Sequence, residues 1–238
     1  MNFSSKKGVT LLEVIIASFI LLMLTVALYE IMIIGLNVWR HSSKQHSNEQ
    51  NVMIMTHRIF SNLKITAASS ITTFSYDGSS VNNLNYIPPS VSLEEDLNSN
   101  NSIAFLSPID GVTSQISVDQ SMGKLQWQKY LIYYLKDSPL SQGYLLCQRE
   151  ISLGSNKGEV NSTPLELFDP ARDILYYINA SSGGDISEER VVIRNVIKLF
   201  FSHYPLNQVE FFIEIGQEET EDETASNRAS KVKVMLAN

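Results

Sequence analysis

Cysteine is almost absent from this chain, and basic residues are outnumbered by acidic ones. The single cysteine, Cys147, cannot form an internal disulfide, and no second cysteine or converging histidine gives it the spacing of a metal site. The 18 Lys and Arg against 25 Asp and Glu give a net charge of −7 over 238 residues. Because phosphate backbones are bound chiefly by Lys and Arg, this balance argues against a nucleic-acid partner. The sequence also has no motif that requires a cofactor.

Charged residues are missing from most of the N-terminal forty residues as well. The run Val14–Tyr29 contains no charge, glycine or proline, and it follows the short basic stretch Lys6-Lys7-Gly8. Counted from Val9, the span is about 21 residues or about 31 Å of helix, close to the ~30 Å hydrocarbon core of a bilayer. We therefore expect one membrane crossing. By the positive-inside rule, Lys6 and Lys7 predict a cytoplasmic leader, with everything after Trp39 outside the cytoplasm.

The apolar run has more than one interpretation. A secretory signal peptide would end in a small-residue cleavage site, and none follows Tyr29. A plain signal anchor fits the composition but not Glu13, which lies inside the apolar stretch. There an ionised carboxylate costs about 2.5–3.5 kcal/mol on insertion scales and is usually paired. Lys7 could reach toward Glu13, or the carboxylate could face a neighbouring chain.

The stretch from Lys6 to Val14 resembles the prepilin leader of type IV pilins and type II secretion pseudopilins, with a basic leader, a glycine, Thr-Leu-Leu-Glu and an apolar helix. The resemblance implies that a membrane peptidase cuts after Gly8 and methylates the new terminus at Val9, where the family usually has Phe. It also implies that Glu13 guides docking by neutralising the terminal amine of a neighbour or its own. Such pairing would relieve two buried charges together.

The same resemblance implies a structural subunit and not an enzyme. Its expected partners are other pilins or pseudopilins, the prepilin peptidase and the inner-membrane assembly platform. Its expected location is the inner membrane, crossed once, with the head in the periplasm or at the cell surface before filament assembly. The rival interpretation is a periplasmic enzyme or ligand-binding domain held by a signal anchor. A DNA-uptake pilin is a further alternative, which the acidic balance disfavours.

Four segments follow from this pattern. They are the leader 1–8, a transmembrane and filament-core helix 9–39, an amphipathic helix 40–70 and a globular head 71–238. In the third segment apolar residues recur at Val52, Met55, Ile59 and Leu63, which defines one helical face. We expect that helix to end at Ala67 or Ala68.

The sequence of the head predicts antiparallel strands. The expected fold class is therefore α+β, with a long N-terminal helix packed on an antiparallel sheet, as in pilins. Short β-branched and aromatic runs alternate with turn residues such as Asp77-Gly78 and Gly183-Gly184. The run Lys129–Leu135 is nearly all apolar, which favours packing on both faces. The expected strands are Ser102–Leu106, Leu125–Leu135, Tyr144–Leu153, Val191–Tyr204, Val209–Ile215 and Lys231–Leu236. Their order resembles the heads of larger minor subunits, the J-type minor pseudopilins and W-type minor pilins.

An acidic run offers the one weak candidate for metal binding in the head. It comprises Glu218, Glu219, Glu221, Asp222 and Glu223. Carboxylate oxygens suit Ca²⁺, but the spacing of a defined calcium loop is missing. A solvated hairpin tip is the favoured interpretation because blocks of like charge repel and stay hydrated. We therefore predict surface loops at Ser90–Ser102 and Gln217–Arg228.

Overall fold

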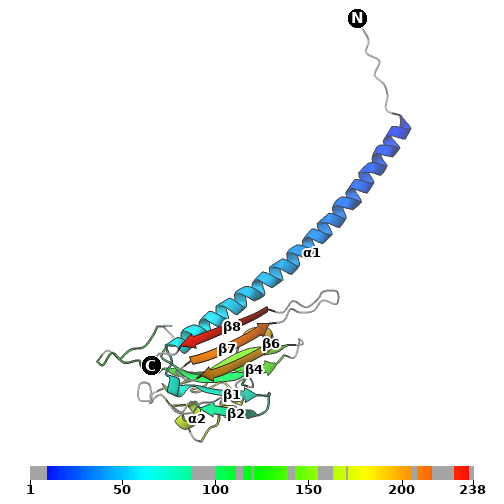
Figure 1. The fold of residues 1–238 in the computed structure, drawn as a ribbon. Helices are drawn as coiled ribbons and strands as arrows, with labels where there is room; N and C mark the ends of the chain where they lie inside the picture. Colours follow the sequence, from blue (N-terminus) through cyan, green and yellow to red (C-terminus); the bar gives the residue numbers. More distant parts are fainter. Residues whose placement is uncertain are drawn as a thin grey trace. The chain divides into compact units, whose positions relative to one another are not determined.

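The structure is a computed structural model of the chain (Figure 1). It describes residues 10–86, 100–110, 115–119, 121–138, 143–154, 163–169, 171–204, 208–215 and 228–235. The chain divides into two compact units, Met1–Ser47 and Asn48–Asn238. One helix, α1 (Leu11–Lys64), contributes residues to both.

In the first unit, α1 carries an apolar surface that no other described part of the chain covers. From Leu11 to Arg40 every side chain is exposed. The stretch Leu11–Ser43 is long and apolar enough to span a membrane. This segment is a single-pass membrane anchor, as the apolar run predicts.

The second unit is built on one eight-stranded antiparallel sheet, with strand order β2-β1-β3-β4-β5-β6-β7-β8. Each strand from β3 to β7 pairs with the next strand along the chain, so β3 to β8 form a simple meander. The strands are β1 (Thr72–Tyr76), β2 (Val81–Tyr86), β3 (Ser102–Ser107), β4 (Lys129–Asp137), β5 (Tyr144–Ser152), β6 (Arg190–Tyr204), β7 (Gln208–Ile215) and β8 (Arg228–Met235). The α+β prediction is confirmed.

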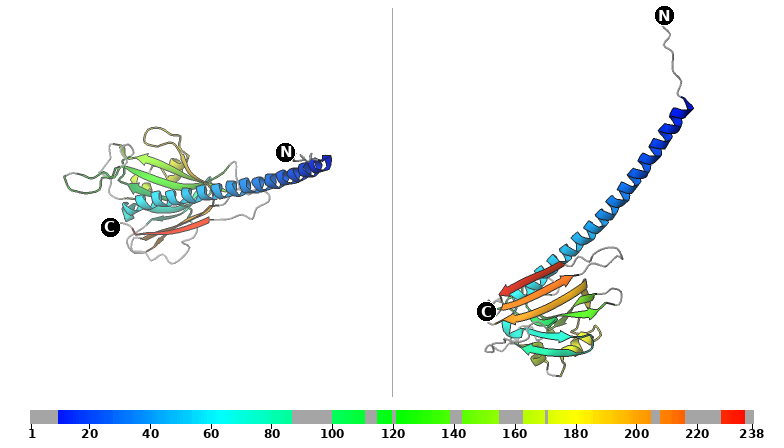
Figure 2. Two further views of the ribbon diagram at one scale, coloured as in Figure 1. Left: turned by 90° about the horizontal axis from the view of Figure 1, so that it is seen from above. Right: turned by 45° about the vertical axis from the view of Figure 1, so that its right-hand side comes forward.

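Within the second unit, residues 48–64 of α1 cover one face of this sheet (Figure 2). All four predicted positions on its apolar face, Val52, Met55, Ile59 and Leu63, are buried there. They pack with sheet residues from β3 to β7, among them Phe105, Leu131, Tyr133, Leu146, Leu199, Phe201, Phe211 and Ile213. Apolar residues spaced three and four apart bring one stripe of the helix to the sheet, and burial of that stripe holds the helix in place.

The opposite face holds a second core, covered by two short helices, α2 (Leu165–Phe168) and α3 (Ile174–Asn179). Alternate residues of β4, namely Tyr130, Ile132 and Tyr134, belong to this core. Because Leu131, Tyr133 and Leu135 belong to the first core, β4 is buried on both faces, as predicted from its apolar run.

Several boundaries differ from the predictions. The helix α1 ends at Lys64 and not at Ala67 or Ala68, and a 3₁₀ turn follows at Ala68–Ser70. The cause is tertiary. The Thr66 hydroxyl donates to the Leu106 carbonyl, and the Leu106 amide donates to the Ser70 hydroxyl at 3.2 Å. These bonds tie the segment to β3, so the chain leaves the helix about one turn early.

The predicted strand from Leu125 begins only at Lys129. Residues before it belong to a small hairpin instead, where Val118 pairs with Leu125 and the Gln126 amide donates to the Ser117 carbonyl at 2.9 Å. The strands β1 and β2 lie on either side of the predicted turn Asp77-Gly78 but were not among the strands named from the sequence, and the helices α2 and α3 were not predicted. All four elements are short, and β2 (VNNLNY) contains three Asn, a residue depleted in strands and common in turns.

Candidate assembly site at the start of the long helix

A reciprocal pair of hydrogen bonds closes the first turn of α1. The Glu13 amide donates to the Thr10 hydroxyl at 3.3 Å, and the Thr10 amide donates to Glu13 Oε2 at 2.9 Å. The Thr10 hydroxyl also lies 3.1 Å from Glu13 Oε2. Thr10 thus occupies the N-cap position and Glu13 the third helical position of a capping box. Two backbone amides that no helical carbonyl can reach are satisfied in this way.

The capping box fixes the direction of the Glu13 carboxylate. It is turned back onto the amide and hydroxyl of Thr10, and its negative charge lies at the positive end of the helix dipole. Both hydrogen bonds to it end on Oε2, whereas Oε1 accepts none from the described residues. A carboxylate can accept several hydrogen bonds, so Oε1 is open to a further donor, and an ammonium group would be the strongest.

Further along the anchor, the hydroxyl groups bond to the helix itself. Ser18 donates to the Val14 carbonyl and Thr25 to the Leu21 carbonyl, each at 2.8 Å. In a bilayer an unsatisfied hydroxyl is costly, and these local bonds remove that cost. The helix can therefore lie in lipid as a single chain.

Several predicted sites lie outside the described residues. These are the leader charges Lys6 and Lys7, the cleavage and methylation positions Gly8 and Val9, and the acidic run from Glu218 to Glu223. Residues 90–99 and 217–227 of the two predicted surface loops also lie outside the described residues. Of the predicted site residues, the structure describes Glu13.

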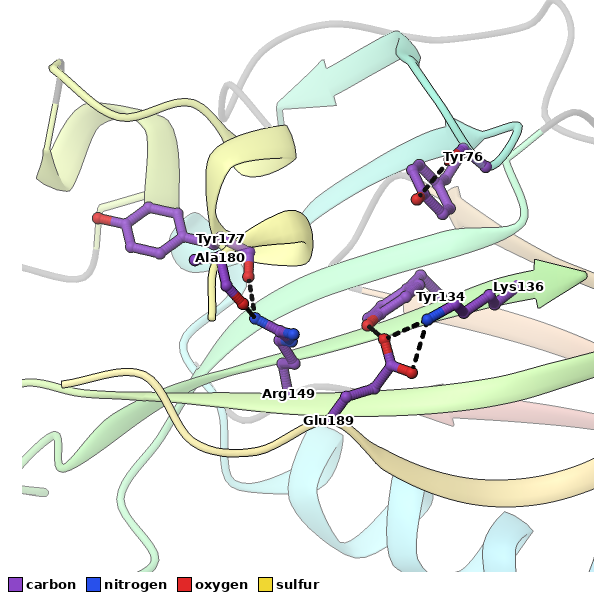
Figure 3. A network of polar contacts seen from close by, with 8 residues as sticks. Tyr76, Tyr134, Lys136, Arg149, Tyr177, Ala180 and Glu189 are labelled. Atoms are coloured by element: carbon purple, nitrogen blue, oxygen red, sulfur yellow. Dashed lines mark hydrogen bonds and ion pairs between the residues drawn. The ribbon is translucent and has the colours of Figure 1, made fainter. Parts of the chain in front are cut away.

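In the head, the sequence did not predict a polar cluster that bridges β4 and the segment before β6 (Figure 3). The Tyr134 hydroxyl donates to Glu189 Oε2 at 2.6 Å, and Lys136 Nζ lies 2.9 Å from Oε1. Burial would raise the pKa of Glu189, but hydrogen bonds from Tyr134 and Lys136 outweigh it and hold that pKa below the usual range. Cys147, fully buried beside this cluster, has its pKa raised to about 12 by burial and by the nearby Glu189 charge.

Arg149 forms a second polar feature, also visible in Figure 3. Its side chain is buried, and Nη1 donates to the carbonyl of Tyr177 at 3.0 Å and to that of Ala180. These carbonyls end the helix α3, whose start is capped by Asp173 accepting from the Tyr176 amide at 2.7 Å. Hydrogen bonds therefore hold this helix at both ends. A helix of six residues would not be stable without such contacts.

A cavity of about 770 Å³ opens between α3 and the end of β5. Among its described lining residues the charged ones are Asp169, Arg172 and Asp185, and Arg172 is already engaged. Its Nε lies 3.5 Å from Asp169 Oδ2, and its guanidinium carbon lies 5.1 Å from the centre of the Tyr176 ring. The described lining contains no His, Cys or Lys.

Comparison with known proteins agrees with the N-terminal geometry. Residues 3–29 match the family model of the prokaryotic N-terminal methylation motif. No curated protein and no solved structure gives a significant match. The matched segment contains the capping box and the first part of the exposed apolar helix. By this segment the chain is a type IV prepilin-like protein, of the pilin and pseudopilin type that a prepilin peptidase processes.

Proposed function

We propose that this chain is a minor subunit of a type IV pilus or a type II secretion pseudopilus, assembled through α1 at the priming tip of the filament. The peptidase cuts after Gly8, and Val9 becomes the methylated terminus. The observation that carries the proposal is the Thr10–Glu13 capping box at the start of an apolar helical segment that is exposed from Leu11 to Arg40. The minor role is supported by the large head, in which the strands that resemble those of minor subunits are neighbours in one sheet.

The proposed location is the inner membrane, with the head outside the cytoplasm. Leu11–Ser43 supplies the anchor, and the leader lysines Lys6 and Lys7 favour a cytoplasmic N-terminus. The partners in this proposal are sibling pilins or pseudopilins, the prepilin peptidase and the assembly platform.

Glu13 has two separable roles in the proposed assembly. Oε2 keeps the capping box and so holds the first turn of the helix. Cleavage would create an ammonium at Val9, directly before Thr10, and Oε1 is free to accept from it or from the amine of a neighbouring subunit. Both charges would otherwise stand alone in a low-dielectric surrounding, so their pairing favours the docked subunit.

Matched substitutions separate the two roles. Glu13→Gln keeps a side chain that can close the capping box but removes the charge, whereas Thr10→Val removes the cap but keeps the charge. We expect Glu13→Gln to lower incorporation into filaments much more than Thr10→Val. If Glu13→Gln enters filaments as well as the unchanged chain does, then the docking role of the carboxylate is refuted.

The maturation step has its own measurement. Mass spectrometry of protein from the native host should find N-methylated Val9 as the first residue. Mature protein that still begins with residues 1–8 would refute the assignment of Gly8 and favour the alternative, a head held by a plain signal anchor. A Gly8→Ala variant, expressed with the peptidase, provides the uncut reference.

A further inference from the structure

The cavity between α3 and the end of β5 lies wholly within the head and takes no part in the proposed assembly. Its volume of about 770 Å³ falls in the range of sites that enclose small-molecule ligands. One wall is formed by α3 and the turn before it, and the other by the end of β5 and the segment 181–186. The side chains on these walls determine which class of ligand could bind.

An exposed aromatic ring forms part of the α3 wall. The helix buries Ile174, Tyr177 and Ile178 in the second core, whereas Tyr176 remains 46% exposed and lines the cavity. The Tyr176 ring is held by two contacts. The Tyr177 ring lies 5.5 Å away, centre to centre, at an interplanar angle of 82°, and the Arg172 guanidinium carbon lies 5.1 Å from the ring centre. A fixed, exposed ring offers an apolar surface to C–H groups of a ligand at little cost in entropy.

Charged groups of both signs line the same cavity. Arg172 pairs with Asp169 through Nε at 3.5 Å, and its side chain remains 48% exposed. A guanidinium carries several N–H donors, so this pair leaves donors for a ligand. Asp185 lines the β5 side, where its carbonyl accepts from the Ser152 amide at 2.7 Å. The Asp185 side chain is exposed and makes no hydrogen bond or ion pair within the part of the head that the structure describes.

Two glycines keep the main chain of the β5 side open to a ligand. Gly183 and Gly184 both line the cavity, and a Cβ added at either would meet no atom within 4 Å. Gly184 has a φ of +60°, a conformation that side chains other than glycine rarely adopt. Ser181, which precedes them, adds an exposed hydroxyl to the lining. The cavity therefore offers hydrogen-bonding groups from several directions around one aromatic surface.

We infer that this cavity binds a neutral oligosaccharide, with the C–H face of one sugar ring packed on Tyr176. Sugar hydroxyl groups can accept from Arg172 and donate to Asp185, because each hydroxyl is both an acceptor and a donor. A ligand with a single charge would satisfy one of these two residues and be repelled by the other. The inference concerns the head alone and does not depend on assembly through α1.

Isothermal titration calorimetry on the full chain tests the ligand class. The detergent must lack a sugar headgroup, such as lauryldimethylamine oxide, so that it does not compete. The neutral probes are cellotriose, maltotriose and triacetylchitotriose, the last of which represents the N-acetylated sugars of cell walls. The charged probes are trigalacturonate and L-alanine. At least one neutral trisaccharide should bind with a Kd of about 1 mM or tighter, and both charged probes should bind at least about tenfold more weakly.

Matched substitutions locate the bound sugar. Tyr176→Ala removes the aromatic surface and should weaken binding at least about fivefold, whereas Tyr176→Phe keeps that surface and should lose much less. Asp185→Ala removes the acceptor and should also weaken binding at least about fivefold. Tyr144→Ala is the control, since Tyr144 is 43% exposed at the start of β5 and does not line this cavity. Urea unfolding of each variant checks that the head is intact.

Each result supports or overturns the inference. Failure of all three neutral trisaccharides to bind would overturn it, as would binding that Tyr176→Ala leaves unchanged. Binding of trigalacturonate alone would make the cavity an anion site at Arg172, and binding of L-alanine alone would make it a site for zwitterions. Neither the Glu13 docking role nor maturation at Val9 is measured in this experiment, so its failure leaves the proposed function standing.

Discussion

The guanidinium of Arg149 on β5 donates to the main-chain carbonyl of Tyr177, 28 residues further along the chain. This bond and the one to Ala180 connect the central sheet to the end of α3. The carbonyl groups at a helix end have no partner in their own helix, and here a buried side chain from another element supplies one. The attachment of α3 to the sheet, and with it the second core, therefore depends on the Arg149 side chain.

Replacing this arginine should destabilise the head. Arg149→Met keeps much of the apolar volume but leaves the two carbonyls without a donor, so we expect a loss of about 1–3 kcal/mol in the free energy of unfolding. Arg149→Lys keeps the charge and should lose less. Urea unfolding of the detergent-solubilised chain, followed by circular dichroism, measures both. An unchanged midpoint for Arg149→Met would mean that the cost of burying the charge offsets its hydrogen bonds.

The Glu189 cluster predicts an acid dependence of stability. The pKa of Glu189 is lower in the folded head than its usual value of 4.5. The ionised carboxylate therefore stabilises the fold at pH values above 4.5. This stabilisation is lost as the pH falls through the lowered pKa of the folded state. Glu189→Gln should therefore be less stable than the unchanged chain by about 1–3 kcal/mol near pH 7. The difference should shrink below about pH 4 as the native carboxylate becomes protonated.

Unfolding free energies measured at a series of pH values show whether the stabilisation by this cluster depends on the ionisation of Glu189. Tyr134→Phe is the matched control, since it removes the 2.6 Å hydrogen bond to Glu189 but leaves the Lys136 ion pair in place. It should reduce the pH dependence without abolishing it. A stability difference between Glu189→Gln and the unchanged chain that stays constant from pH 7 to pH 3 would contradict the assignment.

Much of this arrangement could be predicted from the sequence, for identifiable reasons. The apolar spacing of Val52, Met55, Ile59 and Leu63 was sufficient to predict which stripe of α1 is buried. The unbroken apolar run in β4 likewise predicted burial on both faces. These patterns are local and extend over many residues, so tertiary contacts reinforce them and do not override them.

Other features depend on contacts that the sequence does not display. The end of α1 is set by bonds from Thr66 and Ser70 to β3, and α3 depends on Arg149, which is distant in sequence. The capping box is a different case. The signal Thr-x-x-Glu ahead of an apolar run was present at Thr10–Glu13. The cost of a lone carboxylate in the apolar run predicts a cationic partner for Glu13, whereas in the structure its partner is Thr10, three residues away.

Cys147 should be inert toward thiol reagents in the folded head. It is fully buried, and its pKa is raised to about 12, so the reactive thiolate is scarce at neutral and mildly alkaline pH. We expect maleimide labelling at pH 8 to be at least about a hundredfold slower in native conditions than in urea, because labelling requires opening of the sheet. Mass spectrometry of quenched samples follows the reaction. Rapid labelling of the native chain would mean that β5 is accessible.

The capping box should control how firmly the first turn of the anchor is held. Thr10→Ala removes the N-cap hydroxyl and should destabilise that turn by about 0.5–2 kcal/mol, whereas Thr10→Ser retains the oxygen and should have little effect. The Glu13 amide, which donates to the Thr10 hydroxyl, is the group most directly affected. Amide hydrogen exchange of the chain in detergent micelles should therefore show faster exchange at Glu13 in Thr10→Ala than in Thr10→Ser. Equal protection in the two variants would mean that the surrounding lipid or detergent, and not the Thr10 side chain, shields the start of the helix.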